Sequence, residues 1–365
     1  MTDNNTYINN KINNNSKKVL LGMSGGVDSS AALLMLQEKG FEVIGLTFVQ
    51  DNTCSKSQQA AEDAALVAKR FNIEHHILDV ANEFRGSVIQ SFIDEYLRGR
   101  TPNPCAFCNR NMKFKVLLDF ANKANINFIA TGHYANIRFD ENYKRYVIHK
   151  AKDEKKDQTY FLWGLTQEQL SRIIFPLGNL LKTEIREYAT EHNIPVQNKP
   201  DSQEICFIPD NDYRKFLVDN VETKIEKPGD FMFRGQKKGR HNGFPFYTVG
   251  QRKGLGLSHS EPLFVKSIDP ENNIINLETI DNIADSRIRA SNINFIDESI
   301  IQADSEFIAK IRYRDPGTPA KCEIKDGKLF VEFLSPKNSI ALGQSLVIYK
   351  DDDLLGGGVI DSIDF

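Results

Sequence analysis

Several features that would mark a membrane, secreted or strongly charged protein are missing from this chain of 365 residues. No apolar run approaches the ~20 residues that a membrane-spanning helix needs, so no membrane association is expected. The net charge is only −3 and gives no overall sign of nucleic-acid binding. The five cysteines are an odd number in a long chain, which favours a reducing compartment over a disulfide framework. We therefore expect a cytoplasmic protein.

The first 17 residues lack an apolar segment and contain no arginine, while asparagine is abundant among them. Both absences argue against a secretory signal and against a transit peptide. We expect residues 1–17 to form a disordered tail in front of the first folded element.

Between residues 18 and 205, strand-like and helix-like segments alternate, which is typical of a doubly wound parallel sheet in an α/β domain. Right-handed crossovers between such strands would bring ligands to the carboxyl ends of the strands. The expected strands are 19–23, 43–49, 76–80 and 128–132, and the expected helices are 28–39, 58–71, 84–97 and 114–124.

The composition changes after residue 205. Residues 206–284 hold one helix-like segment at 210–220 and short strand-like segments at 229–231 and 246–249, so we expect a small central α+β linker domain. From 285 to 365 the chain consists of short alternating segments separated by turn signals, which predicts a C-terminal β-barrel. Its expected strands include 306–313, 321–324, 328–333 and 344–350.

The most informative motif is SGGVDSS at 24–30, between the first expected strand and the first expected helix. Two glycines allow a tight turn and a close approach to a ligand, and the first amides of the helix lack intrahelical partners and favour an anion. An ordinary capped turn is the alternative for two glycines alone, but strand, loop and helix together favour a phosphate cradle. The motif is not a Walker A loop, because it contains no lysine to reach the β- and γ-phosphates.

A second motif, TPNPCAFCN at 101–109, places two cysteines in a proline-fixed loop shortly before an expected helix. A thiolate near a helix N-terminus is stabilised and is a better nucleophile. Half of a zinc site is the alternative for Cys105 and Cys108, but a structural zinc site needs four ligands and the sequence has no second such pair. Of the other cysteines, Cys54 and Cys322 are expected to be inert core residues.

As an ordered set, the motifs resemble the bacterial tRNA-specific 2-thiouridylase family, within the PP-loop ATP pyrophosphatases, over residues 18–360. The resemblance implies an enzyme that binds ATP and Mg²⁺, extrudes the wobble uridine of a tRNA anticodon, adenylates the base and replaces its O2 oxygen with sulfur, releasing AMP and pyrophosphate. The matching segments are GMSGGVDSS at 22–30, GRTPNPCAFCNR at 99–110, ATGHYA at 130–135, KDQTYFLW at 156–163, DSQEICFIP at 201–209, YTVGQRKGLG at 247–256, RYR at 312–314 and LGQSLVIY at 342–349.

The resemblance also implies roles for single residues. Cys108 matches the catalytic nucleophile, and Cys206 matches the persulfide carrier, whose terminal sulfur comes from a cysteine desulfurase or a persulfide-carrying protein. Asp28 is expected at the phosphate and metal end of its loop, far from the RNA face, and no metal ligands are assigned. The ATP-contacting positions match Gly22, Met23, Ser24, Gly25, Gly26, Val27, Asp28, Ser29, Phe48 and Gly132. The tRNA-contacting positions match Asn103, Pro104, Cys105, His133, Lys156, Asp157, Gln158, Arg312, Tyr313 and Gln344, of which the first three face the target base.

Two positions depart from the family pattern. Cys105 stands where aspartate is common, which removes a carboxylate that would serve as an acid or base. Phe48 replaces a common methionine, and either side chain supplies an apolar surface for adenine. Together, Cys105, Cys108 and Cys206 could hold a [4Fe–4S] cluster with one open iron, an alternative that we place below the persulfide route.

Two other functions compete with this assignment. A PP-loop amidotransferase or ligase would use the same loop, but would need neither the paired cysteines nor the C-terminal barrel. A non-catalytic RNA-binding protein with a vestigial nucleotide site is disfavoured by the intact SGGVDSS motif. Release of pyrophosphate in the presence of unmodified tRNA separates the last alternative from an enzyme.

Overall fold

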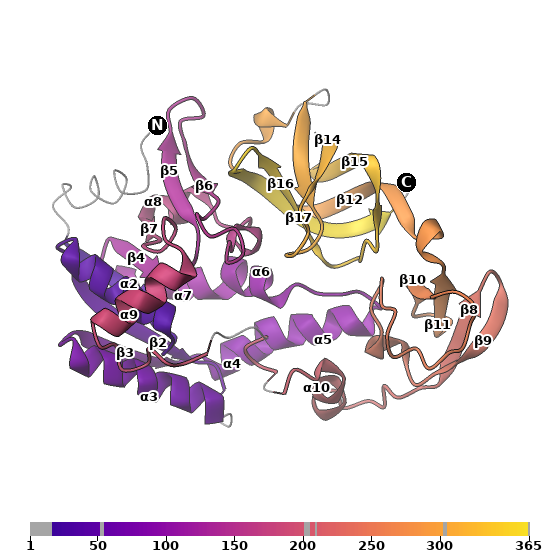
Figure 1. The fold of residues 1–365 in the computed structure, drawn as a ribbon, viewed down its shortest axis with the longest axis horizontal. Coiled ribbons are helices and arrows are strands. Elements are labelled where there is room, and N and C mark those ends of the chain that lie inside the picture. The colour runs from indigo at the N-terminus through magenta and orange to yellow at the C-terminus, as the bar shows by residue number, and fades with distance from the viewer. Residues whose placement is uncertain (1–16, 52–54, 201–204, 209, 302–304, 364–365) are drawn as a thin grey trace.

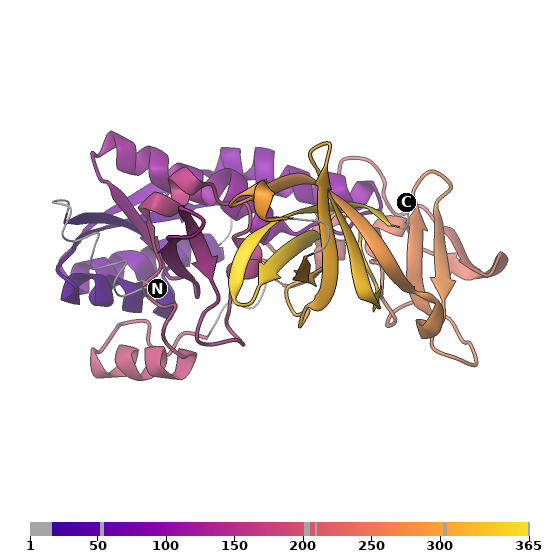
Figure 2. The ribbon, with the colours of Figure 1, turned by 90° about the horizontal axis from the view of Figure 1, so that it is seen from above.

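The computed structural model describes residues 17–51, 55–200, 205–208, 210–301 and 305–363. Cys54 and all but the last residue of the expected tail lie outside these ranges. The molecule is elongated, with a parallel sheet at one end, a small sheet at the other and a barrel between them (Figures 1 and 2). Within the described ranges, no helix has the length and apolar character needed to cross a bilayer.

A five-stranded sheet of parallel strands forms the N-terminal part, in the order β3-β2-β1-β4-β7. It confirms the expected doubly wound α/β fold, and the four expected strands differ from the observed ones only at their ends. The strands are β1 (Lys18–Gly22), β2 (Glu42–Val49), β3 (Glu74–Asp79), β4 (Phe128–Thr131) and β7 (Ile173–Ile174). The accompanying helices are α2 (Val27–Glu38), α3 (Ser55–Arg70), α7 (Phe114–Lys123), α8 (Gln167–Arg172) and α9 (Lys182–Glu191).

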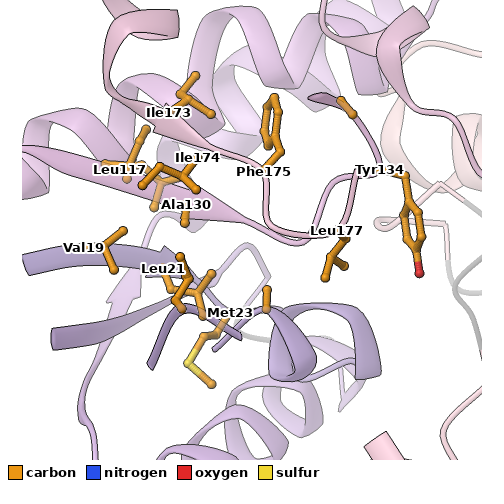
Figure 3. Packing of buried hydrophobic residues seen from close by; sticks show 14 of the residues in the cluster. Val19, Leu21, Met23, Leu117, Ala130, Tyr134, Ile173, Ile174, Phe175 and Leu177 are labelled. Carbon is orange, nitrogen blue, oxygen red and sulfur yellow. The ribbon is translucent and has the colours of Figure 1, made fainter. Parts of the chain in front are cut away.

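Strand β1 lies at the centre of this sheet and is apolar on both faces. Val19, Leu20 and Leu21 are completely buried, as expected for a parallel strand covered on both sides. Figure 3 shows Val19 and Leu21 facing the same apolar layer, with Tyr134 at its edge and the tyrosine hydroxyl directed away from the cluster. The buried centre holds the loop after β1 at the carboxyl edge of the sheet.

The expected helix at 84–97 and the expected loop at 101–109 both differ from the structure. The first consists of α4 (Ala81–Phe84), the π-helical turn η1 (Arg85–Ile89) and α5 (Gln90–Leu97). The cysteines of the second lie inside a helix, α6 (Pro104–Cys108), which continues through the π-helical turn η2 (Asn109–Lys113) into α7. The helix begins early because the Asn103 side chain accepts a hydrogen bond from the Ala106 amide at 3.2 Å, and Pro104 occupies the first turn.

The central part combines one helix, α10 (Tyr213–Asn220), with a four-stranded sheet in the order β10-β11-β8-β9. The expected strand at 246–249 is wrong, because the 3₁₀ turn η4 (Phe244–Phe246) occupies its beginning and the next residues pair with no described strand. Phe246 and Tyr247 are buried in the core, so their side chains explain the strand-like signal. The strands are β8 (Gly229–Phe233), β9 (Gln236–His241), β10 (Phe264–Asp269) and β11 (Ile274–Glu278).

Six C-terminal strands confirm the expected barrel, which closes through pairing of β12 with β17. Cys322 is buried in β14, as expected for a core residue. The expected strand at 306–313 ends at Lys310, because the chain then turns around the buried Asp315. The strands are β12 (Ala284–Phe295), β13 (Glu306–Lys310), β14 (Thr318–Lys325), β15 (Lys328–Asn338), β16 (Ser345–Lys350) and β17 (Asp353–Ile363).

A hairpin that the sequence analysis missed connects the N-terminal part to the barrel. Its strands are β5 (Asn136–Asp140) and β6 (Arg145–His149), and β6 pairs with the beginning of β17. Asp353 of β17 accepts a hydrogen bond from Arg138 at 2.5 Å and contacts the His149 ring nitrogen at 2.8 Å. The domain limits 18–205, 206–284 and 285–365 remain our proposal, since this sheet crosses one of them.

Candidate functional site

The loop between β1 and α2 is open at its helical end. Gly26 is the N-cap of α2, and no described side chain caps the helix, so its first-turn amides are available to an anion. Gly25 has φ +64°, and a Cβ atom there would lie 2.2 Å from the Ala60 carbonyl oxygen. The backbone of this loop therefore requires glycine at position 25.

Gly132, after β4, lies directly against this helix N-terminus. A Cβ atom at Gly132 would approach the Ser29 amide nitrogen to 2.9 Å and would narrow the space over the first turn of α2. The Ser24 and Ser29 hydroxyls lie 3.3 Å apart beside the same space. Partly buried Phe48 is the next-to-last residue of β2 and supplies an apolar surface near the carboxyl edge of the sheet. The open amides, hydroxyls and apolar ring fit a nucleotide.

Asp28, in the first turn of α2, has two strong hydrogen-bond donors. The Tyr134 hydroxyl donates to its Oδ1 atom at 2.7 Å, and the Lys182 ammonium donates to the same oxygen at 2.6 Å. No described group donates to Oδ2. A carboxylate oxygen of this kind, next to an anion site, fits a Mg²⁺ ion that accompanies phosphate groups.

The SGGVDSS motif contains no lysine, but two lysines from distant parts of the chain contact its residues. Lys182, the first residue of α9, lies 154 positions after Asp28, and its side chain is only 11% exposed. Lys199 donates to the Gly25 carbonyl at 3.0 Å and to Asp63 at 2.6 Å. Although burial acts in the opposite direction, the hydrogen bond from Lys199 holds the pKa of Asp63 below its ordinary value. Sequence reasoning missed both lysines because neither belongs to a local motif.

Three cysteines form what we call the cysteine cluster: Cys105, Cys108 and Cys206. All three are free thiols; Cys108 is buried, whereas Cys105 and Cys206 have exposed surface. Neighbouring protein atoms nevertheless displace water around each sulfur. This desolvation, followed by the charges of Cys105 and Cys108, raises the pKa of Cys206 to about 12.

The cluster corrects the expectation of an activated thiol at a helix N-terminus. Desolvation by neighbouring protein atoms raises the pKa of Cys105 and of Cys108 above their ordinary values and outweighs any helix contribution. The positive charge of Lys113, at the end of η2, lowers the pKa of all three cysteines and only partly offsets the desolvation. Lys113 is therefore a cation of this cluster that sequence reasoning missed.

The segment matched to the target base is attached to the barrel. Asn103 donates from its amide nitrogen to the Ser345 hydroxyl of β16 at 3.1 Å. The Gln344 amide nitrogen donates to the carbonyl oxygens of Thr101 and Pro102 at 3.1 and 2.9 Å. Gln344 thus holds the segment in front of Pro104 and Cys105 against the barrel.

Residues 150–158, which we call the 150–158 loop, contain three of the positions matched to tRNA contacts. Asp157 is only 7% exposed and accepts hydrogen bonds from the Ala151 amide at 2.9 Å and the Thr159 hydroxyl at 2.6 Å. The Gln158 side-chain oxygen accepts from the Tyr134 amide at 3.0 Å. Lys156 is half-buried. Asp157 and Gln158 therefore maintain the shape of this loop.

His133 follows Gly132 after β4 and lies within electrostatic reach of Lys113. Its Nδ1 atom is 2.6 Å from the Thr131 hydroxyl, and its ring packs near Phe114 and Phe175. Burial, followed by the charge of Lys113, lowers the pKa of His133 well below its ordinary value. The imidazole is therefore neutral at physiological pH.

The barrel contributes an exposed basic loop after β13. Buried Asp315 shapes it by accepting hydrogen bonds from the amides of Ile311 and Gly317, both at 3.0 Å, and from Lys337 at 2.6 Å. Arg312 is exposed on this loop. The Tyr313 ring lies 4.6 Å from the Phe161 ring, which brings the loop beside the segment that follows the 150–158 loop.

In the described ranges, no three His, Cys, Asp or Glu side chains are arranged to share a metal ion. The sulfurs of Cys105, Cys108 and Cys206 are therefore not arranged to share a metal ion as they stand.

Three family models match successive parts of the chain. Residues 17–210 match the tRNA methyl transferase HUP domain, residues 214–277 the tRNA methyl transferase PRC-barrel domain, and residues 285–360 the aminomethyltransferase beta-barrel domain. These matches follow one another in the order of the three sheets.

Close relatives cover nearly the whole chain. The tRNA-specific 2-thiouridylase MnmA 1 of Thermoanaerobacter sp. (strain X514) is 44% identical and covers 95% of this chain and 98% of its own. The tRNA-specific 2-thiouridylase MnmA of Acetivibrio thermocellus is also 44% identical, with 94% and 99% covered. A solved 4-thiouridine synthetase–RNA complex with bound ATP is 21% identical, covers 56% of this chain and 50% of its own, and has a TM-score of 0.37, too low to add to these matches.

Proposed function

This chain belongs to the tRNA-specific 2-thiouridylase family, and from that premise we propose that it uses ATP to replace the O2 oxygen of the tRNA wobble uridine with sulfur. The observation that most strongly supports this proposal is a helix N-terminus open to phosphate, with Asp28 beside it, in the same chain as three free thiols within electrostatic reach of one another. The first feature suits nucleotide cleavage, and the second suits sulfur transfer.

The ATP half of the reaction belongs to the loop after β1. The first-turn amides of α2 and the hydroxyls of Ser24 and Ser29 would bind phosphate oxygens, while Phe48 would contact the adenine ring. Oδ2 of Asp28 would hold Mg²⁺, which offsets the charge of the phosphates when it is bound. Attack of the uridine O2 atom on the α-phosphorus then breaks the bond to the β-phosphate, releases pyrophosphate and leaves AMP attached to the base.

The sulfur half belongs to the cysteine cluster. The terminal sulfur of a Cys206 persulfide attacks C2 of the adenylated base, AMP leaves with the oxygen, and a disulfide links the base to Cys206. The Cys108 thiolate then attacks the Cys206 sulfur, and the electron pair of the broken bond stays on the sulfur of 2-thiouridine. A cellular thiol must reduce the resulting Cys108–Cys206 disulfide, and a cysteine desulfurase or persulfide-carrying protein must supply the next sulfur.

Lys113 has a role in this scheme that follows from the raised thiol pKa values. The free cysteines are protonated at neutral pH, but a persulfide is more acidic than a thiol. We assign to Lys113 the stabilisation of the anionic sulfur, because its charge acts on Cys105, Cys108 and Cys206 together.

The tRNA would lie across the 150–158 loop and the loop that presents Arg312. Their basic side chains supply phosphate contacts, and Asn103, Pro104 and Cys105 would face the extruded base. His133 and Tyr313 stay expected RNA contacts, and Gln344 acts by holding the base-facing segment against the barrel.

The iron–sulfur route stays as the second candidate, because Cys105 adds a third thiol to the cluster, but it requires the three sulfurs to move, since as they stand they are not arranged to share a metal ion. Anaerobic purification followed by iron and sulfide analysis separates the two routes. The persulfide route requires full activity in an iron-free preparation. Stoichiometric iron that is lost together with activity in Cys105→Ala would instead support the cluster.

The main test combines two product measurements on the same reaction. The protein is incubated with ATP, Mg²⁺, unmodified tRNA and a persulfide donor, and both nucleotides and tRNA nucleosides are analysed by mass spectrometry. We expect AMP and 2-thiouridine in equal amounts. Formation of ADP would contradict the PP-loop assignment, and AMP without 2-thiouridine would favour a ligase or amidotransferase.

A further inference from the structure

Tyr134 connects two parts of the molecule that were expected to lie apart. Its hydroxyl donates to Asp28 at 2.7 Å, and its backbone exchanges two hydrogen bonds with Gln158 of the 150–158 loop. The Tyr134 amide donates to the Gln158 side-chain oxygen at 3.0 Å, and the Gln158 amide donates to the Tyr134 carbonyl at 2.9 Å. The buried Tyr134 therefore contacts both Asp28 of the candidate nucleotide site and a loop that we assign to RNA binding.

The second donor to Asp28 is attached to the same loop. The Lys182 amide donates to Asp153 Oδ2 at 2.9 Å, while the Lys182 side chain donates to Asp28 at 2.6 Å. The Lys182 ammonium also lies 5.9 Å from the centre of the Tyr134 ring. Both donors to Oδ1 of Asp28 are thus attached to the 150–158 loop, one through Gln158 and the other through Asp153.

The loop itself is held in one shape by hydrogen bonds to buried groups. Asp157 accepts from Ala151 and Thr159, as described above, and the Lys152 amide donates to the Gly178 carbonyl at 2.8 Å. The Asp153 side chain also accepts from the Lys155 amide at 3.1 Å. Two of these bonds join Asp153 and Asp157 to other residues of the loop, so a ligand that moves its basic side chains would also act on Asp153 and Gln158.

We propose that Tyr134 is a positioning residue that couples the 150–158 loop to Asp28, so that RNA bound on this loop changes the affinity of the nucleotide site for Mg²⁺–ATP. The inference rests on the proposed function, because it takes the bound ligands to be tRNA and ATP. Tyr134 acts through Asp28 and the loop, and need not contact either ligand. Since coupling is reciprocal, bound nucleotide changes RNA affinity by the same factor.

The test measures binding and avoids turnover. The affinity for ATP with a methylene bridge between the α- and β-phosphorus atoms is measured with Mg²⁺, in the presence and absence of saturating unmodified tRNA transcript. For the unaltered protein we expect a difference of about fivefold or more, and the same factor for tRNA with and without the analogue. Equal affinities in both conditions would overturn the proposal.

The informative variant is Tyr134→Phe, which keeps the buried ring and removes only the hydroxyl. We expect the coupling factor to fall towards one, while the affinity for tRNA alone stays unchanged. The matched control is Tyr188→Phe, because the Tyr188 hydroxyl donates to Glu38 at 2.7 Å in the same domain but away from the 150–158 loop. The control should retain full coupling. Full coupling in Tyr134→Phe would overturn the proposal.

A second variant keeps the proposal testable if Tyr134→Phe does not fold. Asp153→Asn retains the size of the side chain but weakens the acceptor for the Lys182 amide, and we expect it to reduce the coupling factor partially. Unchanged coupling in Asp153→Asn, with Tyr134→Phe unfolded, also counts against the proposal. If AMP and 2-thiouridine form normally but no coupling exists, the inference fails and the proposed function stands. If ADP forms instead, the function fails whatever the coupling measurements give.

Discussion

In the loop after β1 and the first turn of α2, which we call the nucleotide loop, the Asp28 carboxylate is paired with a hydroxyl and an ammonium, whereas the cysteine cluster holds three neutral thiols near Lys113. The loop is therefore charged and hydrogen-bonded before any ligand arrives. Desolvation keeps the cluster uncharged, and under the proposed function its reactivity depends on the arrival of a more acidic persulfide sulfur. The difference suggests that adenylation relies on preorganised polar groups, while sulfur transfer is controlled by loading.

The largest expected effect separates the two regions completely. Cys206→Ser should reduce 2-thiouridine formation by about 10³-fold or more, because the proposed route carries the transferred sulfur on Cys206. A first turnover of pyrophosphate release should persist, since the loop after β1 is unchanged. Labelled persulfide sulfur and mass spectrometry of the protein measure the loading step directly.

The control for this variant is Cys322→Ala, in barrel strand β14. It should load sulfur and thiolate tRNA normally, with a somewhat lower melting temperature because a buried atom is removed. If folded Cys322→Ala loses thiolation, the assignment of the cluster is wrong.

A smaller but still large effect is expected at the nucleotide loop. Lys182→Met keeps the apolar stem of the side chain and removes the ammonium that pairs with Asp28. The variant therefore lacks a hydrogen bond between charged groups, and such a bond contributes about 1.5–3 kcal/mol. AMP formation should therefore fall by about 10- to 100-fold. Persulfide loading of Cys206 should not change, and that contrast sharpens the comparison between the regions.

Lys144→Met is the matched control for Lys182→Met. Lys144 forms a carboxylate pair of the same length, 2.6 Å, with Glu141, but on the exposed hairpin. AMP formation in this variant should equal that of the unaltered protein. Equal losses in both variants would point to a general effect of charge.

The next effect, of several-fold, is expected on the rate at which Cys206 is alkylated and on how that rate depends on pH. Because the pKa of Cys206 is raised to about 12, its reactive thiolate is scarce at pH 8. As long as the pH is below this pKa, the thiolate fraction increases about tenfold for each unit by which the pH rises. Iodoacetamide alkylation, followed by peptide mass spectrometry, should therefore be slow at pH 8 and accelerate steadily towards pH 10.

Lys113→Met removes a positive charge that lowers this pKa, so alkylation of Cys206 should slow several-fold at each pH. Lys115→Met, two residues further along and exposed in α7, is the control and should leave the rates unchanged. Alkylation that is fast and independent of pH would show that the thiol is already ionised, and would remove the contrast with the nucleotide loop.

The smallest expected effect concerns the barrel. Arg312→Ala should weaken tRNA binding and reduce the slope of log affinity against log salt by about one unit, as for one lost phosphate contact. Folding stability should change by less than about 0.5 kcal/mol, because the side chain is exposed. Lys325→Ala, exposed at the end of β14, serves as the control, and an equal change in slope there would remove the specific role of Arg312.

The sequence predicted those features that depend on local patterns. The run around Leu20 and the glycines at 25 and 26 define a strand, a tight loop and a helix within a short stretch, so periodicity and backbone geometry suffice. The closed barrel was predicted in the same way from short alternating segments and turns such as Asp326-Gly327.

The features that were missed depend on contacts between distant segments. Lys182 and Lys199 reach the nucleotide loop only after the sheet has formed, and a single lysine has no periodic signal. The thiol pKa values were predicted in the wrong direction, because a helix N-terminus can be inferred from Pro104 but burial of Cys108 cannot. The Phe246 segment was assigned as a strand because its apolar character does not distinguish paired backbone from a buried turn.

The β5–β6 hairpin has a practical consequence for dissecting this protein into fragments. A fragment that ended before residue 206 would retain β6 without its neighbour β17, and Arg138 would lose one of its two carboxylate partners. The bare strand edge would be open to pairing with other copies, so such a fragment should be prone to aggregation. Activities of the nucleotide loop are better studied by point substitution in the full-length chain than by truncation.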